Sequence, residues 1–253
     1  MTDSRPPKDD LVRAIRPGFE LRATADKKSP TLYGHFAKFN DWAEINSVWE
    51  GNFMERIAPG AFTKTIAENR SDIKVLFQHG MDYQIGDKPL GAIKELREDD
   101  EGPYYEVSLL DAPYVRNDIL PGLEAGLYGA SFRFKVMREE FADKVKESNH
   151  NPDSLPERTI KEVRLFEFGP VTFPAYASAT AGVRSLTDEY IFDRLRTKPD
   201  RLRELIASVQ VPAPSDDAGP EATSKERREE PVTPRFRSLE EFTQWLTSQT
   251  SKS

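Results

Sequence analysis

Alternation of apolar and polar side chains is the most extensive pattern in the chain. In Asp72–Gln78 the apolar residues Ile73, Val75 and Phe77 occupy every second position, which is typical of a β-strand with one buried face. Strands are predicted on this basis at Phe19–Ala23, Thr31–Phe39, Asp72–Gln78, Leu90–Leu96, Tyr104–Leu110, Leu127–Val136 and Thr159–Phe168.

Helical spacing of apolar residues is less common. Ala61–Asn69 follows a Pro-Gly turn and has helical composition and length, and Val115–Ala125 is helical with Pro121 interrupting it or starting its second part. A third helix is expected over Tyr190–Val209, broken or restarted at Pro199. Strands therefore outnumber helices, and the residues favour a mixed, β-rich α+β fold.

The composition divides the chain into segments. Residues 1–17 are polar and read as a disordered arm, residues 18–210 as one folded domain, and residues 139–158 as an exposed insertion between two of its strands. Residues 211–235 have the composition of a Pro-rich flexible linker. Residues 236–253 form a tail whose apolar residues at helical spacing predict a short amphipathic helix, a pattern typical of a docking peptide.

Charge and residue usage exclude several classes of protein. The formal net charge is −7 and the basic residues are scattered among acidic ones, which disfavours a nucleic-acid partner. The absence of cysteine excludes a disulfide scaffold, a thiolate nucleophile and a cysteine-based zinc site. No stretch reaches the ~20 apolar residues of a membrane-spanning helix, and the N-terminal sequence lacks a signal-peptide core, so we expect a cytosolic protein without a membrane partner.

Candidate catalytic residues come from the few histidines and from strand serines. Of His35, His79 and His150, only His79 follows a predicted strand and precedes a glycine, where the sheet can fix it at a cleft. A neutral imidazole is the usual general base for a serine nucleophile. Ser131 lies in a predicted strand on the face opposite Phe132, with small neighbours that leave room around its hydroxyl. No Gly-x-Ser-x-Gly elbow is present, which disfavours an α/β-hydrolase.

A third group is needed to orient the imidazole. Glu167 is flanked by apolar residues, where an unpaired carboxylate is costly, so a partner for it is expected. Asp82 and Asp111 are the rival acids.

Several segments, taken in order, resemble the prohead serine protease family of tailed phages, whose fold is similar to the herpesvirus assembly protease. The matching segments are GHFAKFN from Gly34, ERIAPGAFTKTI from Glu55, VLFQHG from Val75, GASFRF from Gly129 and LFEFGPVTFPAY from Leu165. The resemblance implies that His79 is the general base, Ser131 the nucleophile and Glu167 the third member of a catalytic triad. It also implies an antiparallel, barrel-like sheet with peripheral helices.

The resemblance further implies a serine endopeptidase that works inside the assembling prohead, in the host cytoplasm. Its expected substrates are the scaffold, the N-terminal extension of the major capsid protein and its own tail. No cofactor or metal is expected. The alternative is a scaffold or capsid-assembly module that uses the same fold without catalysis. A metal-dependent hydrolase is disfavoured, because the three histidines are scattered and no His-Glu-x-x-His motif is present.

Overall fold

The structure is a computed structural model, which describes residues 5–16, 19–22, 30–172 and 184–196. The chain divides into two units, residues 1–194 and 195–253, and all described residues except 195 and 196 lie in the first. Its strands are β1 (Leu11–Ile15), β2 (Glu20–Arg22), β3 (Thr31–His35), β4 (Ala43–Ser47), β5 (Gly51–Ile57), β6 (Lys74–Val75), β7 (Gly91–Glu98), β8 (Pro103–Leu109), β9 (Tyr128–Ala142), β10 (Glu157–Thr172) and β11 (Arg184–Ser185). Its helices are α1 (Thr63–Asn69), the 3₁₀ turn η1 (Gln78–Gly80), the π-helical turn η2 (Val115–Ile119), α2 (Leu120–Glu124) and α3 (Thr187–Arg196).

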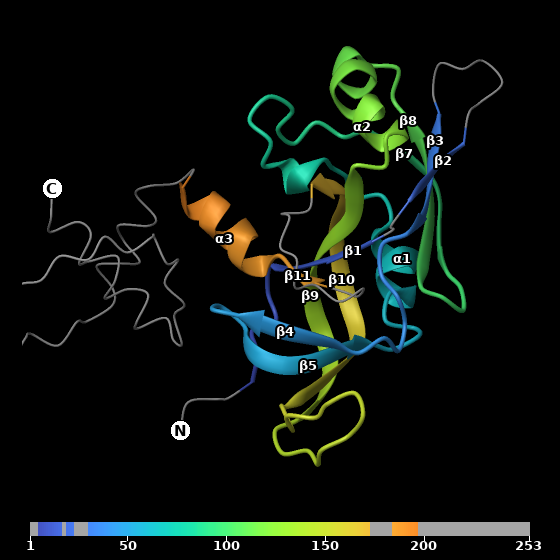
Figure 1. Cartoon of the computed structure of the whole chain (residues 1–253). Coiled ribbons are helices and arrows are strands. Elements are labelled where there is room, and N and C mark those ends of the chain that lie inside the picture. The colour runs from blue at the N-terminus through green and yellow to red at the C-terminus, as the bar shows by residue number, and fades with distance from the viewer. Residues whose placement is uncertain (1–4, 17–18, 23–29, 173–183, 197–253) are drawn as a thin grey trace, which may run out of the picture. The chain divides into compact units, whose positions relative to one another are not determined.

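The described strands form two sheets. The larger has the order β11-β1-β9-β10-β5-β4, with β6 also paired to β10, and the smaller has the order β2-β3-β8-β7. The long antiparallel pair β9–β10 runs through the larger sheet (Figure 1). Both sheets contribute to one core, in which Phe36 stacks against Phe168 with ring centroids 4.8 Å apart and also contacts Tyr105 of the smaller sheet at 6.1 Å.

The α+β, strand-rich class predicted from the pattern is confirmed, but a barrel-like sheet is not. In the part of the chain that the structure describes, the strands pair into two open sheets. Antiparallel pairing predominates, yet β10 pairs in parallel with both β5 and β6. Alternation along a strand reveals which face is buried, and it carries no information on whether the first and last strands meet.

The prediction of a disordered arm over residues 1–17 is wrong for β1. Leu11–Ile15 is a strand that is buried at every position and pairs with β9 on one edge and β11 on the other. A strand buried on both faces does not alternate, and its Arg13 resembles a surface residue until its partners are known. The guanidinium of Arg13 is fully buried and forms ion pairs of 2.6 Å with Glu50 and 2.7 Å with Glu55.

The exposed insertion predicted at residues 139–158 is shorter than expected. β9 continues to Ala142 and β10 begins at Glu157, so both ends of the predicted insertion belong to the sheet. Arg158 is fully buried and donates to Glu139 at 2.7 Å. These polar residues are expected to face solvent from the sequence, but in the structure they pair with each other inside the protein. The predicted linker at 211–235 and tail at 236–253 lie outside the described residues.

Candidate active site

Ser131 lies near the start of β9, between β1 and β10. Its register partners are Ala14 of β1 and Gly169 of β10, so the strand is held on both edges at this position. The next residue, Phe132, enters the core on one face of the sheet. Alternation along the strand leaves the Ser131 side chain on the opposite face.

His79 is presented by η1, a short turn that follows β6. Gln78 and His79 both have left-handed backbone angles, with φ of 49° and 57°. Such angles are unfavourable for residues with a side chain and occur where surrounding contacts enforce them. Gly80 N–H donates to the Phe77 carbonyl at 2.9 Å, and the Gln78 side-chain amide donates to Thr172 Oγ1 of β10. These contacts fix the imidazole above the larger sheet.

The structure brings His79, Ser131 and Glu167 together in a line. His79 Nε2 is 2.8 Å from Ser131 Oγ, and His79 Nδ1 is 2.7 Å from Glu167 Oε1. With Glu167 as a carboxylate, which can only accept, Nδ1 carries the proton and Nε2 is free to accept one. The arrangement can therefore move a proton from the serine hydroxyl to the imidazole.

The Ser131 hydroxyl has a second acceptor, the backbone carbonyl of Arg13 in β1, also at 2.8 Å. A hydroxyl has a single proton, so Ser131 donates either to this carbonyl or to His79 Nε2. Position 13 of β1 is held by the two buried ion pairs of its side chain, which raise the pKa of Arg13 although burial alone would lower it. Strand β1 is thus part of the site.

Gly169 allows the strand that leads to His79 to lie close to β10. A Cβ at position 169 would be 1.9 Å from the carbonyl oxygen of Leu76, which no packed structure tolerates. Leu76 is three residues before His79, and Leu76 N–H donates to the Phe168 carbonyl at 3.0 Å. The absence of a side chain at 169 therefore sets the distance between the imidazole and the sheet.

The rival acids and the other histidines lie in different surroundings. Asp82 accepts from the backbone N–H groups of Gln84 and Ile85, and Asp111 pairs with Arg116. His35 Nε2 is 2.9 Å from Asp99, and the ring of His150 stacks on Trp42 with centroids 4.6 Å apart. None of these contacts involves the imidazole of His79.

Sequence reasoning missed three contributors to the site: the Arg13 carbonyl, Gly169 and Tyr190 of α3. The run LVRAI at positions 11–15 was a usable signal, since a short apolar run is consistent with a strand buried on both faces. The roles of Gly169 and Tyr190 depend on contacts between distant segments, which no local pattern contains.

The three side chains are covered. Ser131 is 0% exposed and Glu167 is 1% exposed, while the His79 side chain is 8% exposed. The ring of Tyr190 stands edge-on to the His79 ring, with centroids 5.9 Å apart. The helix that carries Tyr190 therefore lies over the site.

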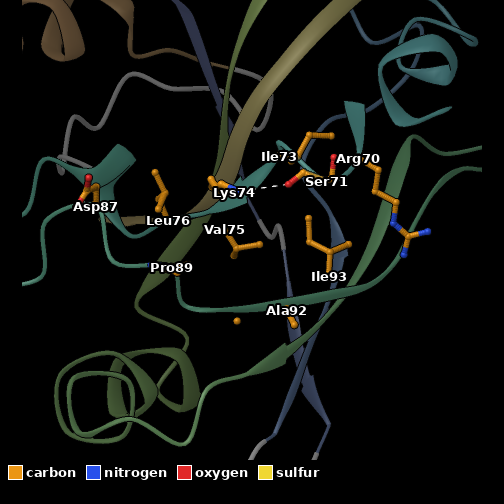
Figure 2. A pocket seen from close by; sticks show the side chains of 11 residues that line it. Arg70, Ser71, Ile73, Lys74, Val75, Leu76, Asp87, Pro89, Ala92 and Ile93 are labelled. Carbon is orange, nitrogen blue, oxygen red and sulfur yellow. Dashed lines mark hydrogen bonds between the residues drawn. The ribbon is translucent and has the colours of Figure 1, made fainter. Parts of the chain in front are cut away.

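A separate hollow of about 1010 Å³ lies between β6 and β7 (Figure 2). It is lined by residues from two stretches, 70–76 and 87–93, among them Ile73, Val75 and Ile93. Ser131, His79 and Glu167 do not line it, so this hollow does not give access to the site.

Among the described residues, no group of three or more His, Cys, Asp or Glu side chains is arranged to hold a metal ion. No helix in this part of the chain is long and apolar enough to cross a membrane.

A hydroxyl, an imidazole and a carboxylate linked at hydrogen-bonding distances are the arrangement of serine hydrolases. The family described as Caudovirus prohead serine protease matches residues 18–190. The chain therefore belongs to the caudovirus prohead serine protease family, whose members are proteases of phage capsid maturation.

Comparison with solved structures finds the bacteriophage T4 capsid assembly protease, gp21, at 13% sequence identity and a TM-score of 0.38. The match covers 66% of this chain and 98% of that chain. Comparison with curated proteins finds no match.

Proposed function

We propose that the protein is a serine endopeptidase of prohead maturation in which Ser131 is the nucleophile, His79 the general base and Glu167 the residue that orients the imidazole. One observation carries the proposal: His79 Nε2 is 2.8 Å from Ser131 Oγ. This distance lies in the range in which an imidazole can take the proton of an attacking hydroxyl.

The proposed reaction is acyl transfer in two halves. Ser131 Oγ attacks the carbonyl carbon of a peptide bond while His79 Nε2 takes the hydroxyl proton and then gives it to the leaving amine. Water next attacks the acyl-enzyme while His79 Nε2 takes a proton from it, and His79 gives that proton to Ser131 Oγ as the acid product leaves. The Arg13 carbonyl must lose its hydrogen bond from Ser131 in the first step, because the ester oxygen has no proton to donate.

Glu167 has the role of holding one tautomer of His79. Its Oε1 is 2.7 Å from His79 Nδ1, and the Arg133 Nε lies 3.5 Å from the same oxygen. A carboxylate in this position fixes the ring and stabilises the imidazolium that forms during attack. The burial of Glu167 strengthens this interaction, since less water screens the two groups.

The proposed substrates are the scaffold and the N-terminal extension of the major capsid protein, with the chain's own tail as a further one. The proposed place of action is the inside of the assembling prohead in the host cytoplasm. Membership of the prohead protease family supports both proposals.

Co-expression with the major capsid protein tests the proposal. The parent chain is expected to yield a shortened capsid protein whose intact mass identifies the cleaved bond. Ser131→Ala and His79→Ala should each reduce the rate of cleavage by about 10⁴-fold or more. The double variant should cleave only slightly more slowly than either single variant, because the two groups act as one unit.

Matched controls use residues of the same type elsewhere. Ser108→Ala changes a serine of β8 in the smaller sheet, and His150→Ala changes a histidine of the β9–β10 connection. Both variants should cleave at the parent rate. Cleavage by the Ser131→Ala chain at the parent rate would refute the proposed role of Ser131, whereas a parent chain that supports assembly but leaves the capsid protein uncut would favour a non-catalytic assembly module.

A further inference from the structure

The covered state of the catalytic residues conflicts with the reaction proposed for them. A polypeptide substrate must bring a carbonyl carbon to Ser131 Oγ, yet Ser131 is 0% exposed and the His79 side chain is 8% exposed. Ser131 lies in a strand paired on both edges, so a substrate cannot approach in the plane of the sheet. Only the face that bears the hydroxyl remains as a route.

That face is occupied by α3. Its Tyr190 lies edge-on to His79 at 5.9 Å, and the Arg133 guanidinium lies 5.5 Å from the Tyr190 ring centroid. Leu186 and Tyr190 form an apolar cluster with three residues of the sheet face, Val12, Ala14 and Val171. Met81 and Ile191 pack against the same cluster.

The polar contacts that hold α3 lie mostly at its ends. Asp188 accepts from the backbone N–H groups of Val48 at 2.8 Å and Trp49 at 3.1 Å, and from the hydroxyl of Ser47 at 2.7 Å. At the other end, Arg194 donates to Asp10 at 3.2 Å. Both partners of that last pair are about two-fifths exposed, so solvent weakens it.

Beneath α3 lies the face of the larger sheet that bears the Ser131 hydroxyl. It is apolar at Val12, Ala14 and Val171, and the triad lies beside these residues. Apolar side chains of α3 now fill the position that a bound polypeptide requires. The contacts that cover the Ser131 hydroxyl therefore also shield this apolar face from water.

We propose that the face beneath α3 is the substrate-binding surface of the protease, that the chain's own α3 occupies it in this structure, and that α3 leaves when a polypeptide with apolar side chains takes its place. The proposal rests on the proposed function, and it adds the location of the substrate surface and the element that competes for it. Tyr190 and Asp188 are the residues that keep the site closed.

Access to position 131 can be measured without catalysis. The chain contains no cysteine, so Ser131→Cys introduces a single thiol whose reaction rate with 5,5′-dithiobis(2-nitrobenzoate) reports exposure. The full-length chain is used, with Ser131→Cys alone and combined with Tyr190→Ala or with Asp188→Ala. Each added change should accelerate the reaction by about tenfold or more, because each favours the open form.

A matched change controls for unspecific loosening. Tyr83→Ala removes a tyrosine that is 100% exposed. It should not alter the reaction rate of the thiol. Thermal melting of every variant shows whether it is folded, and the two different releasing changes keep the test valid if one of them unfolds the domain.

The results separate the two proposals. An equal reaction rate in the Ser131→Cys chain with and without the releasing changes would overturn the inference, because α3 would then not control access to position 131. With Ser131 retained, Tyr190→Ala should also cleave a capsid-derived peptide faster than the parent by a similar factor. Faster thiol reaction without any cleavage would leave α3 as the cover and reject the proposed protease function.

Discussion

The two halves of the site are held in place by different means. Ser131 and Glu167 belong to β9 and β10, which pair with each other from Tyr128 to Ala142 and from Glu157 to Thr172. His79 instead follows β6, a strand of two residues, and sits in a turn with left-handed backbone angles. A long ladder fixes the first half, whereas a few specific contacts fix the second.

This difference indicates where the site is sensitive. In the ladder half, the backbone hydrogen bonds between β9 and β10 fix the positions of Ser131 and Glu167. A change of one side chain there affects the chemistry but leaves the distance between the two strands unchanged. In the His79 half, substitutions that never touch the reacting atoms should still move the imidazole. Positioning errors of about 1 Å can cost about 10²-fold in rate.

The largest effect after loss of the nucleophile or base is expected in the ladder half, at Glu167. Glu167→Gln keeps the shape but can place an N–H against His79 Nδ1, which favours the wrong tautomer, so kcat/KM should fall by about 10⁴-fold. Steady-state cleavage of a capsid-derived peptide measures this. Glu140→Gln alters a β9 residue whose side chain is 73% exposed, and should leave kcat/KM unchanged. A rate for Glu167→Gln near that of the parent would assign the orienting role to another acid.

Gly169→Ala should show that the His79 half depends on backbone packing. The added methyl group would meet the Leu76 carbonyl, so the segment that leads to His79 must move and cleavage should slow by about 10²-fold. The control is Gly102→Ala, whose Cβ would be 2.2 Å from the Ala37 carbonyl in a different part of the fold. Both variants should have a lower melting temperature than the parent. Only Gly169→Ala should also cleave more slowly per folded molecule. Equal losses would contradict the comparison.

A smaller effect is expected from the side-chain contact that supports the η1 turn. Thr172→Val removes the acceptor for the Gln78 amide, which releases a residue with φ of 49° and lets His79 sample other positions. The rate should fall by about tenfold or less, since the left-handed conformation costs about 1–2 kcal/mol. Thr63→Val, which removes a hydroxyl bound to Glu98, is the matched control. No change in Thr172→Val would mean that η1 is held by its backbone alone.

The smallest effect on cleavage at neutral pH is expected at Glu50, which supports β1. Burial raises the pKa of Glu50, but the ion pair with Arg13 more than offsets this, so its pKa lies below the ordinary value of 4.5. The stabilisation is therefore present above pH 4.5 and is lost as the pH falls through the lowered pKa. The melting temperature of the parent should fall as the pH is lowered through that range.

Glu50→Gln should lower the melting temperature at neutral pH, because it leaves the Arg13 guanidinium with less negative charge around it in a buried place. The loss is expected to be about 3 kcal/mol. The melting temperature of Glu50→Gln should fall less steeply with decreasing pH than that of the parent, because the variant lacks the titrating carboxylate. An acid profile identical to the parent's would show that other groups govern the acid stability.

The sequence predicted the ladder half better than its surroundings. Alternation placed β7 and β8 to within two residues at each end, and it found β9 and β10 but ended them six and four residues too early. The proximity of His79, Ser131 and Glu167 could be expected from the resemblance to the family, and the structure brings these three residues together.

Other features depend on contacts between distant segments. β1 was missed because Arg13 is charged, and its two acidic partners lie 37 and 42 residues away. A helix was predicted over Tyr190–Val209, and α3 covers residues 190–196 of that range, while residues 197–209 lie outside the described residues. Nothing in the periodicity indicates that Tyr190 contacts His79. The ion pairs of Arg13 and the packing of Tyr190 against His79 arise from tertiary structure, so local sequence patterns do not predict them.

The most direct test of the central claim is covalent labelling of the nucleophile. The full-length chain with Tyr190→Ala, which exposes the site, is treated with a fluorophosphonate and mapped by peptide mass. The account predicts a single adduct, located on Ser131, and its loss when His79→Ala is added. An adduct on a different serine, or labelling of Ser131 that is unchanged without His79, would contradict it.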